Sequence, residues 1–274
     1  MRKFKLINSS GAEFDLMDKT AFFQSASGLG LQRNIDSVQA GYDFIETDNE
    51  LDQHTVSGEI AFGDYERYAD FVRFCAKSPL VFCYQPINRW YFINCTISKL
   101  EKGEIQSARL VCLVDFLCYS TWYDKVSVNK TKVDTSVGKT YSYAYPYIYA
   151  ETSAGSVEII NTGDIPSPCK LHIKGAVVNP SWALIKDGKT ILTGKVNATV
   201  PYGHKIIVDS SPASIEIAEY TNNNVFVSNL YQNSDFATAR FLTIPTGNCK
   251  VTFMHEGAGI IDAFVEVKQL AETV

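Results

Sequence analysis

The stretch "NTGDIPSPCKLHIKG", residues 161–175, combines a turn, two prolines and a strand. Its first four residues favour a turn, and apolar side chains then alternate with polar ones from Cys169 to Ile173 before Gly175. Alternation at period two is typical of a half-buried strand, and proline in a sheet is confined to edges, strand starts and bulges. The stretch therefore predicts a turn and a proline-marked edge that lead into a strand. It contains no obvious catalytic group.

The same pattern of short alternating runs between turn residues continues through residues 151–274. The runs include "SVEIIN", "SWALIKDG", "HKIIVDSS", "CKVTFMHEG" and "IIDAFVEVKQL". Many short strands with regular turn signals, and no room for crossover helices, are typical of a two-sheet antiparallel sandwich.

The first half mixes strands with one helix. "FKLIN" and "EFDL" flank a short turn and predict a hairpin. In "DYERYADFVRFCAKSP", residues 64–79, Asp64 is suited to cap a helix, and Pro79 marks its end. The apolar stripe predicted for this helix consists of Tyr68, Phe71, Val72 and Cys75.

A strand predicted over residues 104–118, after the turn "EKGE", is apolar on both faces. We expect Cys112 and Val114 to face the helix and the core. Val111, Leu113 and Leu117 lie on the other face, which needs a second cover. These three residues are therefore the candidate subunit interface.

The domain organisation is predicted from the change of pattern along the chain. We expect a first domain over residues 1–135 and a second over 136–274, with an exposed connector at about 119–150. Five tyrosines alternate strictly in this connector: Tyr141, Tyr143, Tyr145, Tyr147 and Tyr149. They predict either a strand at the start of the second domain or an aromatic docking strip, because period two places all five rings on one face.

Composition excludes several classes of function. The chain has 274 residues and a formal net charge of -5, which argues against specific nucleic-acid binding. No segment approaches the roughly twenty apolar residues of a membrane span, and the N-terminus lacks a secretory pattern, so we expect synthesis in the cytoplasm and no membrane insertion. The seven cysteines have no C-x-x-C spacing. We expect reduced thiols, no metal site and no cofactor.

Catalysis is not expected. The four histidines are His54, His172, His204 and His255, and no G-x-S-x-G motif accompanies them. His172 alternates with apolar neighbours on a predicted strand, so we expect its side chain to face solvent.

Four segments of the second half, in this order, resemble the C-terminal domain of siphophage distal tail proteins. They are "NTGDIPSPCKLHIKG" (161–175), "NPSWAL" (179–184), "VPYGHKIIVDSS" (200–211) and "FLTIPTGNCKVTFMHEG" (241–257). The first half is similar to the same family through "GLGLQ" (28–32) and "PLVFCYQ" (79–85) after the helix. The resemblance covers nearly the whole chain.

This resemblance implies a mainly-β fold with one helix. The first half would be a ring-forming β-sandwich or sheet with the α-helix, and the second a galectin-like or carbohydrate-module-like antiparallel β-sandwich. The implied function is that of a structural virion protein, a hexameric hub at the distal end of a long non-contractile phage tail. The implied partners are further copies of the chain, the major tail tube protein, the tail-associated protein, and receptor-binding or baseplate proteins. The implied location is the tip of the virion tail, after synthesis in the cytoplasm of the host bacterium.

The alternative hypothesis is that the second half is a carbohydrate-binding module that recognises host cell-wall saccharide. Sandwich lectins stack sugars on exposed aromatic side chains, and four aromatic residues lie near predicted turns: Trp182, Tyr202, Tyr220 and Tyr231. The favoured interpretation is that these rings pack in the core or at a subunit contact, and saccharide binding is the second hypothesis.

Overall fold

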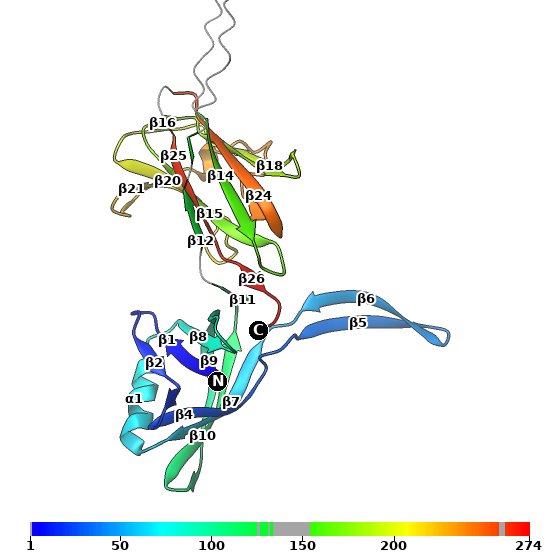
Figure 1. Cartoon of the computed structure of the whole chain (residues 1–274), viewed down its shortest axis with the longest axis vertical. Helices are drawn as coiled ribbons and strands as arrows, with labels where there is room; N and C mark the ends of the chain where they lie inside the picture. The colour runs from blue at the N-terminus through cyan, green and yellow to red at the C-terminus, as the bar shows by residue number, and fades with distance from the viewer. Residues whose placement is uncertain (1, 125–126, 131, 134–153, 258–260) are drawn as a thin grey trace, which may run out of the picture. The chain divides into compact units, whose positions relative to one another are not determined.

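The computed structural model describes residues 2–124, 127–130, 132–133, 154–257 and 261–274. They form two compact units, Met1–Lys125 together with Leu270–Val274, and Val126–Gln269 (Figure 1). The five alternating tyrosines of the predicted connector lie outside the described residues. None of the described helices is long and apolar enough to cross a membrane.

The first unit is a ten-stranded antiparallel sheet with one helix. Its main path runs β2-β1-β8-β9-β10-β7-β4-β3, β11 pairs with β9 and β26, and β5 and β6 form a separate two-stranded sheet. The elements are β1 (Lys3–Ile7), β2 (Glu13–Asp15), β3 (Met17–Asp18), β4 (Ala21–Ser27), β5 (Arg33–Ala40), β6 (Asp43–Leu51), β7 (Thr55–Phe62), α1 (Tyr65–Cys75), β8 (Leu80–Gln85), β9 (Tyr91–Gln106), β10 (Arg109–Cys118), β11 (Trp122–Tyr123) and β26 (Leu270–Ala271).

The helix α1 confirms the predicted cap. The Asp64 carboxylate accepts a hydrogen bond from the Arg67 backbone N–H at 2.7 Å, which satisfies one of the free donors of the first turn. Phe71 is fully buried, and Tyr68 and Cys75 pack against the core. Val72 belongs to the same predicted stripe, but it is exposed.

The hairpin of β9 and β10 has a different turn from the predicted one. β9 continues through "EKGE" to Gln106, and the chain reverses at Ser107 and Ala108, which both have positive φ. Two consecutive residues in the left-handed region are typical of the tight hairpin turns whose twist matches the strands.

The start of the predicted connector belongs to the first unit. Trp122 is fully buried in the core of that unit, and β11 pairs with β26 from the C-terminal end of the chain. Ala271 is buried beside it, and Val274 packs against the same core. A fragment that ends at residue 135 would therefore lack a strand of this unit.

The second unit is built from two larger antiparallel sheets. One sheet has the path β12-β25-β15-β20-β21-β22 with β23 paired to β15, the other has the order β13-β14-β24-β17-β18, and β16 pairs with β19. The elements are β12 (Ser127–Lys130), β13 (Lys132–Val133), β14 (Ala154–Asn161), β15 (Ser167–Lys174), β16 (Val177–Val178), β17 (Ser181–Lys186), β18 (Lys189–Lys195), β19 (Thr199–Val200), β20 (His204–Asp209), β21 (Glu216–Thr221), β22 (Phe226–Asn229), the 3-10 helix η1 (Tyr231–Asn233), β23 (Thr243–Ile244), β24 (Gly247–Met254) and β25 (Asp262–Val267). One apolar core draws on both sheets, as a sandwich requires.

The stretch 161–175 provides a central strand of this sandwich. Asn161 is buried; its side-chain oxygen accepts from the Gly163 N–H at 3.0 Å, and its amide donates to the Ile244 carbonyl at 3.0 Å. Pro168 lies at the start of β15, before the pairing with β25 begins at Cys169. The proline therefore marks the beginning of a strand with neighbours on both sides, rather than a sheet edge.

All seven cysteines are free thiols in the described structure. Burial raises the pKa of the Cys83 and Cys169 thiols to about 12, so both remain protonated at neutral pH. They act as small apolar side chains within the cores.

Candidate assembly surface

The hairpin of β5 and β6 is an exposed arm of the first unit. Its register pairs Arg33 with Leu51 at the root and Ala40 with Asp43 at the tip, and every residue of both strands is exposed. Figure 1 shows the arm extending away from the sheet that carries it. Gly41 has a φ of 70° at the tip, where a tight turn requires the left-handed region.

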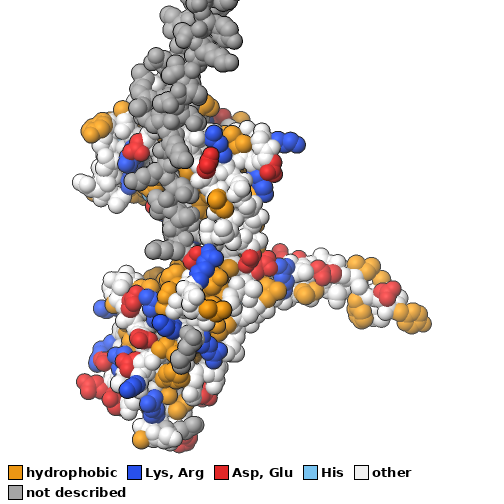
Figure 2. Space-filling model, in the orientation of Figure 1, with side chains coloured by type: hydrophobic (Ala, Val, Ile, Leu, Met, Phe, Trp, Pro, Cys, Tyr) orange, Lys and Arg blue, Asp and Glu red, His pale blue; other side chains and the backbone are white. Residues whose placement is uncertain are grey.

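Six large apolar side chains of the arm are exposed, from 36% to complete exposure: Ile35, Val38, Tyr42, Phe44, Ile45 and Leu51. Figure 2 shows apolar side chains at its tip and acidic ones along its length. An isolated two-stranded hairpin is only marginally stable in water, and contiguous exposed apolar surface is typical of interaction sites. The arm is therefore the strongest candidate for a contact surface in the described residues.

The register divides the arm into two faces of different chemistry. The acidic face consists of Asn34, Asp36, Val38, Ala40, Asp43, Ile45, Asp48 and Glu50, and the opposite face carries Arg33, Ile35, Phe44, Glu46 and Leu51. Residues 33–51 hold five acidic side chains and one basic one, a formal charge of -4. Asp36 and Asp48 lie directly opposite each other, and such a like-charge pair destabilises a hairpin until a cation approaches it.

The root of the arm is fixed by Arg33. Its guanidinium forms an ion pair with Glu272 at 2.7 Å and donates to the Asn49 side-chain oxygen at 2.9 Å. The Asp52 N–H donates to the Gln32 carbonyl at 3.1 Å. The ion pair with Glu272 thus anchors the root of the arm to the C-terminal segment of the same unit.

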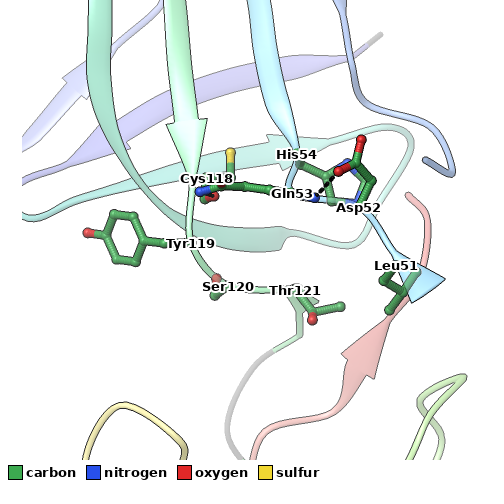
Figure 3. A pocket seen from close by; sticks show the side chains of 8 residues that line it. All are labelled: Leu51, Asp52, Gln53, His54, Cys118, Tyr119, Ser120 and Thr121. Carbon is green, nitrogen blue, oxygen red and sulfur yellow. Dashed lines mark hydrogen bonds between the residues drawn. The ribbon is translucent and has the colours of Figure 1, made fainter. Parts of the chain in front are cut away.

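A hollow of about 440 Å³ lies beside the arm root (Figure 3). It is lined by residues 51–54 and 118–121, and the Gln53 amide donates to the Cys118 carbonyl at 2.9 Å across it. Burial lowers the pKa of His54 and raises that of Cys118 to about 11. The Cys118 thiol is therefore protonated at neutral pH, which is not the reactive thiolate form.

The predicted interface residues of β10 occupy different environments. Cys112 and Val114 are buried in the core, as predicted. Val111 is also buried within its own unit, Leu117 is half-buried, and only Leu113 is exposed, at 47%. A neighbour that covers Leu113 and Leu117 remains a prediction, whereas Val111 needs no further cover.

The four aromatic candidates of the second unit do not form one platform. Trp182 is buried, and its Nε1 donates to the Arg240 carbonyl at 2.9 Å. Tyr231 lies beside the same arginine, 5.3 Å from its guanidinium. Tyr220 instead contacts Phe226 on the neighbouring strand, and Tyr202 is 90% exposed on a turn. The described residues thus provide no observation that favours a saccharide site.

His172 is buried, contrary to the solvent-facing position predicted for it. Its ring stacks on Phe264 with centroids 4.1 Å apart, and Nε2 lies 3.3 Å from the Glu266 carboxylate. Burial, together with the charges of Lys205 and Lys170, lowers its pKa to about 4. The alternation was interpreted correctly as an outward position, but the neighbouring side chains on this sheet cover it. Among the described residues, no group of three His, Cys, Asp or Glu side chains could hold a metal ion.

The depressed pKa of His172 predicts an acid-sensitive second unit. Below about pH 6.5 the His172 imidazole is protonated in the unfolded chain, but in the folded protein it stays neutral down to about pH 4. The stability of the folded state therefore falls as the pH falls from about 6.5 to about 4. The loss reaches about 3 kcal/mol at most. Urea unfolding at pH 7 and pH 4.5 should show a smaller loss for His172→Gln than for the unmodified protein. Equal losses in the two proteins would contradict the assignment.

The arm of β5 and β6 is not predicted by the sequence pattern. The signal present was "QAGYDF", residues 39–44, in which a glycine turn is flanked by residues that favour strands. Alternation gave no help, because both faces of the arm are exposed and carry polar side chains.

Comparison with known proteins identifies a domain in the first half of the chain. Residues 3–119 match the model of the distal tail protein N-terminal domain. No curated protein sequence matches the chain significantly. Among solved structures, the chain is similar to one in the phage P2 baseplate in its activated conformation with Ca, with a TM-score of 0.67, 16% identity and 100% of both chains covered.

A second solved structure agrees with this fold. It is the SPP1 Dit protein, described as a paradigm of the hub adsorption apparatus in phages that infect Gram-positive bacteria. The TM-score is 0.66 at 10% identity, with 97% of this chain and 99% of that one covered. At such identities the likeness shows the fold of the whole chain. The match over residues 3–119 assigns this part of the chain as a distal tail protein N-terminal domain.

Proposed function

We propose that this protein is a structural, non-catalytic subunit that assembles into a hexameric ring. The ring would form at the distal end of a long non-contractile tail, after synthesis in the cytoplasm of the host bacterium. There it would link the major tail tube protein to the tail-associated protein and to receptor-binding or baseplate proteins. The single observation that carries this proposal is the arm of β5 and β6, because it offers apolar surface that its own unit does not cover.

The contact that the arm offers is suited to a ring. A projecting hairpin on one copy must meet a different surface on the next copy, so the contact is head-to-tail. Head-to-tail contacts generate closed rings when the rotation between copies closes, and open filaments when it does not. The likeness to a baseplate protein and to a hub protein supports closure.

The two units divide this task. The arm and its anchor belong to the first unit, so assembly would depend on that unit. The sandwich of the second unit has a core of its own, and it would remain available for adhesion or baseplate proteins.

Electron microscopy of the purified full-length protein tests the proposal. We expect ring-shaped particles with sixfold symmetry, and light scattering should give a mass six times the 30.5 kDa of one chain. A chain that stays monomeric at high micromolar concentration would contradict assembly through its own surfaces. Rings of another symmetry would contradict the hexamer alone.

A further inference from the structure

We propose that the acidic face of the arm of one copy docks into a basic, aromatic groove on the first unit of the next copy. The inference rests on the proposed function and names the receiving site for the arm. The groove has a volume of about 490 Å³, and its wall includes Arg2, Lys3, Lys5, Met17, Phe22 and Trp90. Its size lies in the range of sites that bury most of a bound ligand.

The groove combines apolar side chains with free positive charge. Phe22, Met17 and Trp90 are each only half-buried in the unit that carries them. The Lys5 ammonium lies 5.0 Å from the centre of the Trp90 ring and forms an ion pair with Glu13 at 2.7 Å. Arg2 and Lys3 are exposed, and neither has an ion-pair partner within the described part of the chain. These two cations remain available for a visiting carboxylate, although Glu13 and Asp15 also line the groove.

The acidic face of the arm matches this groove both in its apolar surface and in its charge. Val38 and Ile45 are paired across the two strands and supply apolar contact. Asp36 and Asp48 supply two carboxylates on the same face. The repulsion between them is relieved when a lysine or arginine approaches, and Arg2 and Lys3 provide that charge.

The second hollow of the first unit is a poorer receiver. Its lining beside the arm root contains Asp52 and neither lysine nor arginine. An acidic arm would meet like charge there, and like-charge contacts across an interface suppress the wrong pairing. Charge therefore selects the groove over the arm-root hollow.

The occupant is a second copy of this chain. All residues of the acidic face are exposed in the single chain, so the arm does not fill the groove of its own unit. The arm and the groove are different patches, as a head-to-tail contact requires. Each copy would thus donate one arm and receive one.

Charge reversal on the full-length protein tests the pairing. The groove variant is Arg2→Glu with Lys3→Glu, and the arm variant is Asp36→Lys with Asp48→Lys. The arm variant keeps a like-charge pair in the hairpin, so the stability of the arm itself is matched. We expect each variant to weaken self-association at least tenfold in sedimentation experiments, and the chain with all four reversals to regain it.

A matched control reverses two exposed cations outside the groove, Arg73→Glu with Lys77→Glu, and should assemble like the unmodified protein. A groove variant that assembles normally, or a fourfold variant as weak as the groove variant, overturns the docking site. If the groove variant assembles normally but the arm variant does not, the arm is still the contact of the proposed ring, and only the proposed receiving site is wrong. Recovery in the fourfold variant also shows that the groove substitutions leave the fold intact.

Discussion

Truncating three apolar side chains of the arm to alanine, Val38, Phe44 and Ile45, is expected to leave the protein monomeric at concentrations where the unmodified protein assembles. These side chains are exposed by 58%, 71% and 58% in the single chain, so the fold of the unit does not depend on them. A buried side chain of this kind contributes about 1.5–3 kcal/mol. Val38 and Ile45 lie on the acidic face that is proposed to dock, so their loss alone should weaken association on the order of a hundredfold.

The control for this variant carries the same chemistry in the second unit. Ile191, Val225 and Phe226 are exposed by 47%, 61% and 57%, and alanine at all three removes comparable apolar surface. Light scattering at matched concentrations should show assembly in the control and its absence in the arm variant. If both variants assemble, the arm is not the contact. If only the control fails, the second unit carries the assembly instead.

The sequence predicted those helices and strands that bury one face in a core. Asp64 and the residues after it gave the helix, and the alternation of Cys169, Leu171 and Ile173 gave a strand of the sandwich, because each pattern reflects one core. The arm has no buried face, so no alternation marks it. Its chemistry became visible only when the register placed Asp36 opposite Asp48 and Val38 opposite Ile45.

Contacts between distant parts of the chain were equally hidden. The strand β26 has two residues, too few for a period to be recognised, yet it pairs with β11 across nearly 150 residues of sequence. Likewise, the ion pair of Arg33 with Glu272 follows from the fold and not from either local pattern. The sequence therefore predicted several elements of the first unit, but not its C-terminal strand, the arm or the anchor of the arm.

The largest stability effect is expected at Trp122, in the segment that the sequence assigned to an exposed connector. Its side chain is fully buried among Phe82, Tyr84 and Ala271, with ring centroids 6.3 Å and 6.4 Å from the two aromatic neighbours. Trp122→Ala should destabilise the first unit by about 3–5 kcal/mol, because the lost burial is accompanied by a cavity. In calorimetry the transition of the first unit should fall on the order of 10 °C, and that of the second unit should not move.

Two further variants separate this explanation from its alternatives. The Trp122 Nε1 has no hydrogen-bond partner within the described residues, so Trp122→Phe removes a buried unsatisfied donor as well as volume and should cost far less than alanine. Ile87→Ala, at a side chain of the same unit that is 76% exposed, should change stability by less than about 0.5 kcal/mol. A loss below about 1 kcal/mol for Trp122→Ala would mean that residues 119–124 form a connector after all. A large loss of stability in the first unit alone would instead show that the segment carrying Trp122 belongs to the core of that unit. There β11 pairs with β26 from the C-terminal part of the chain.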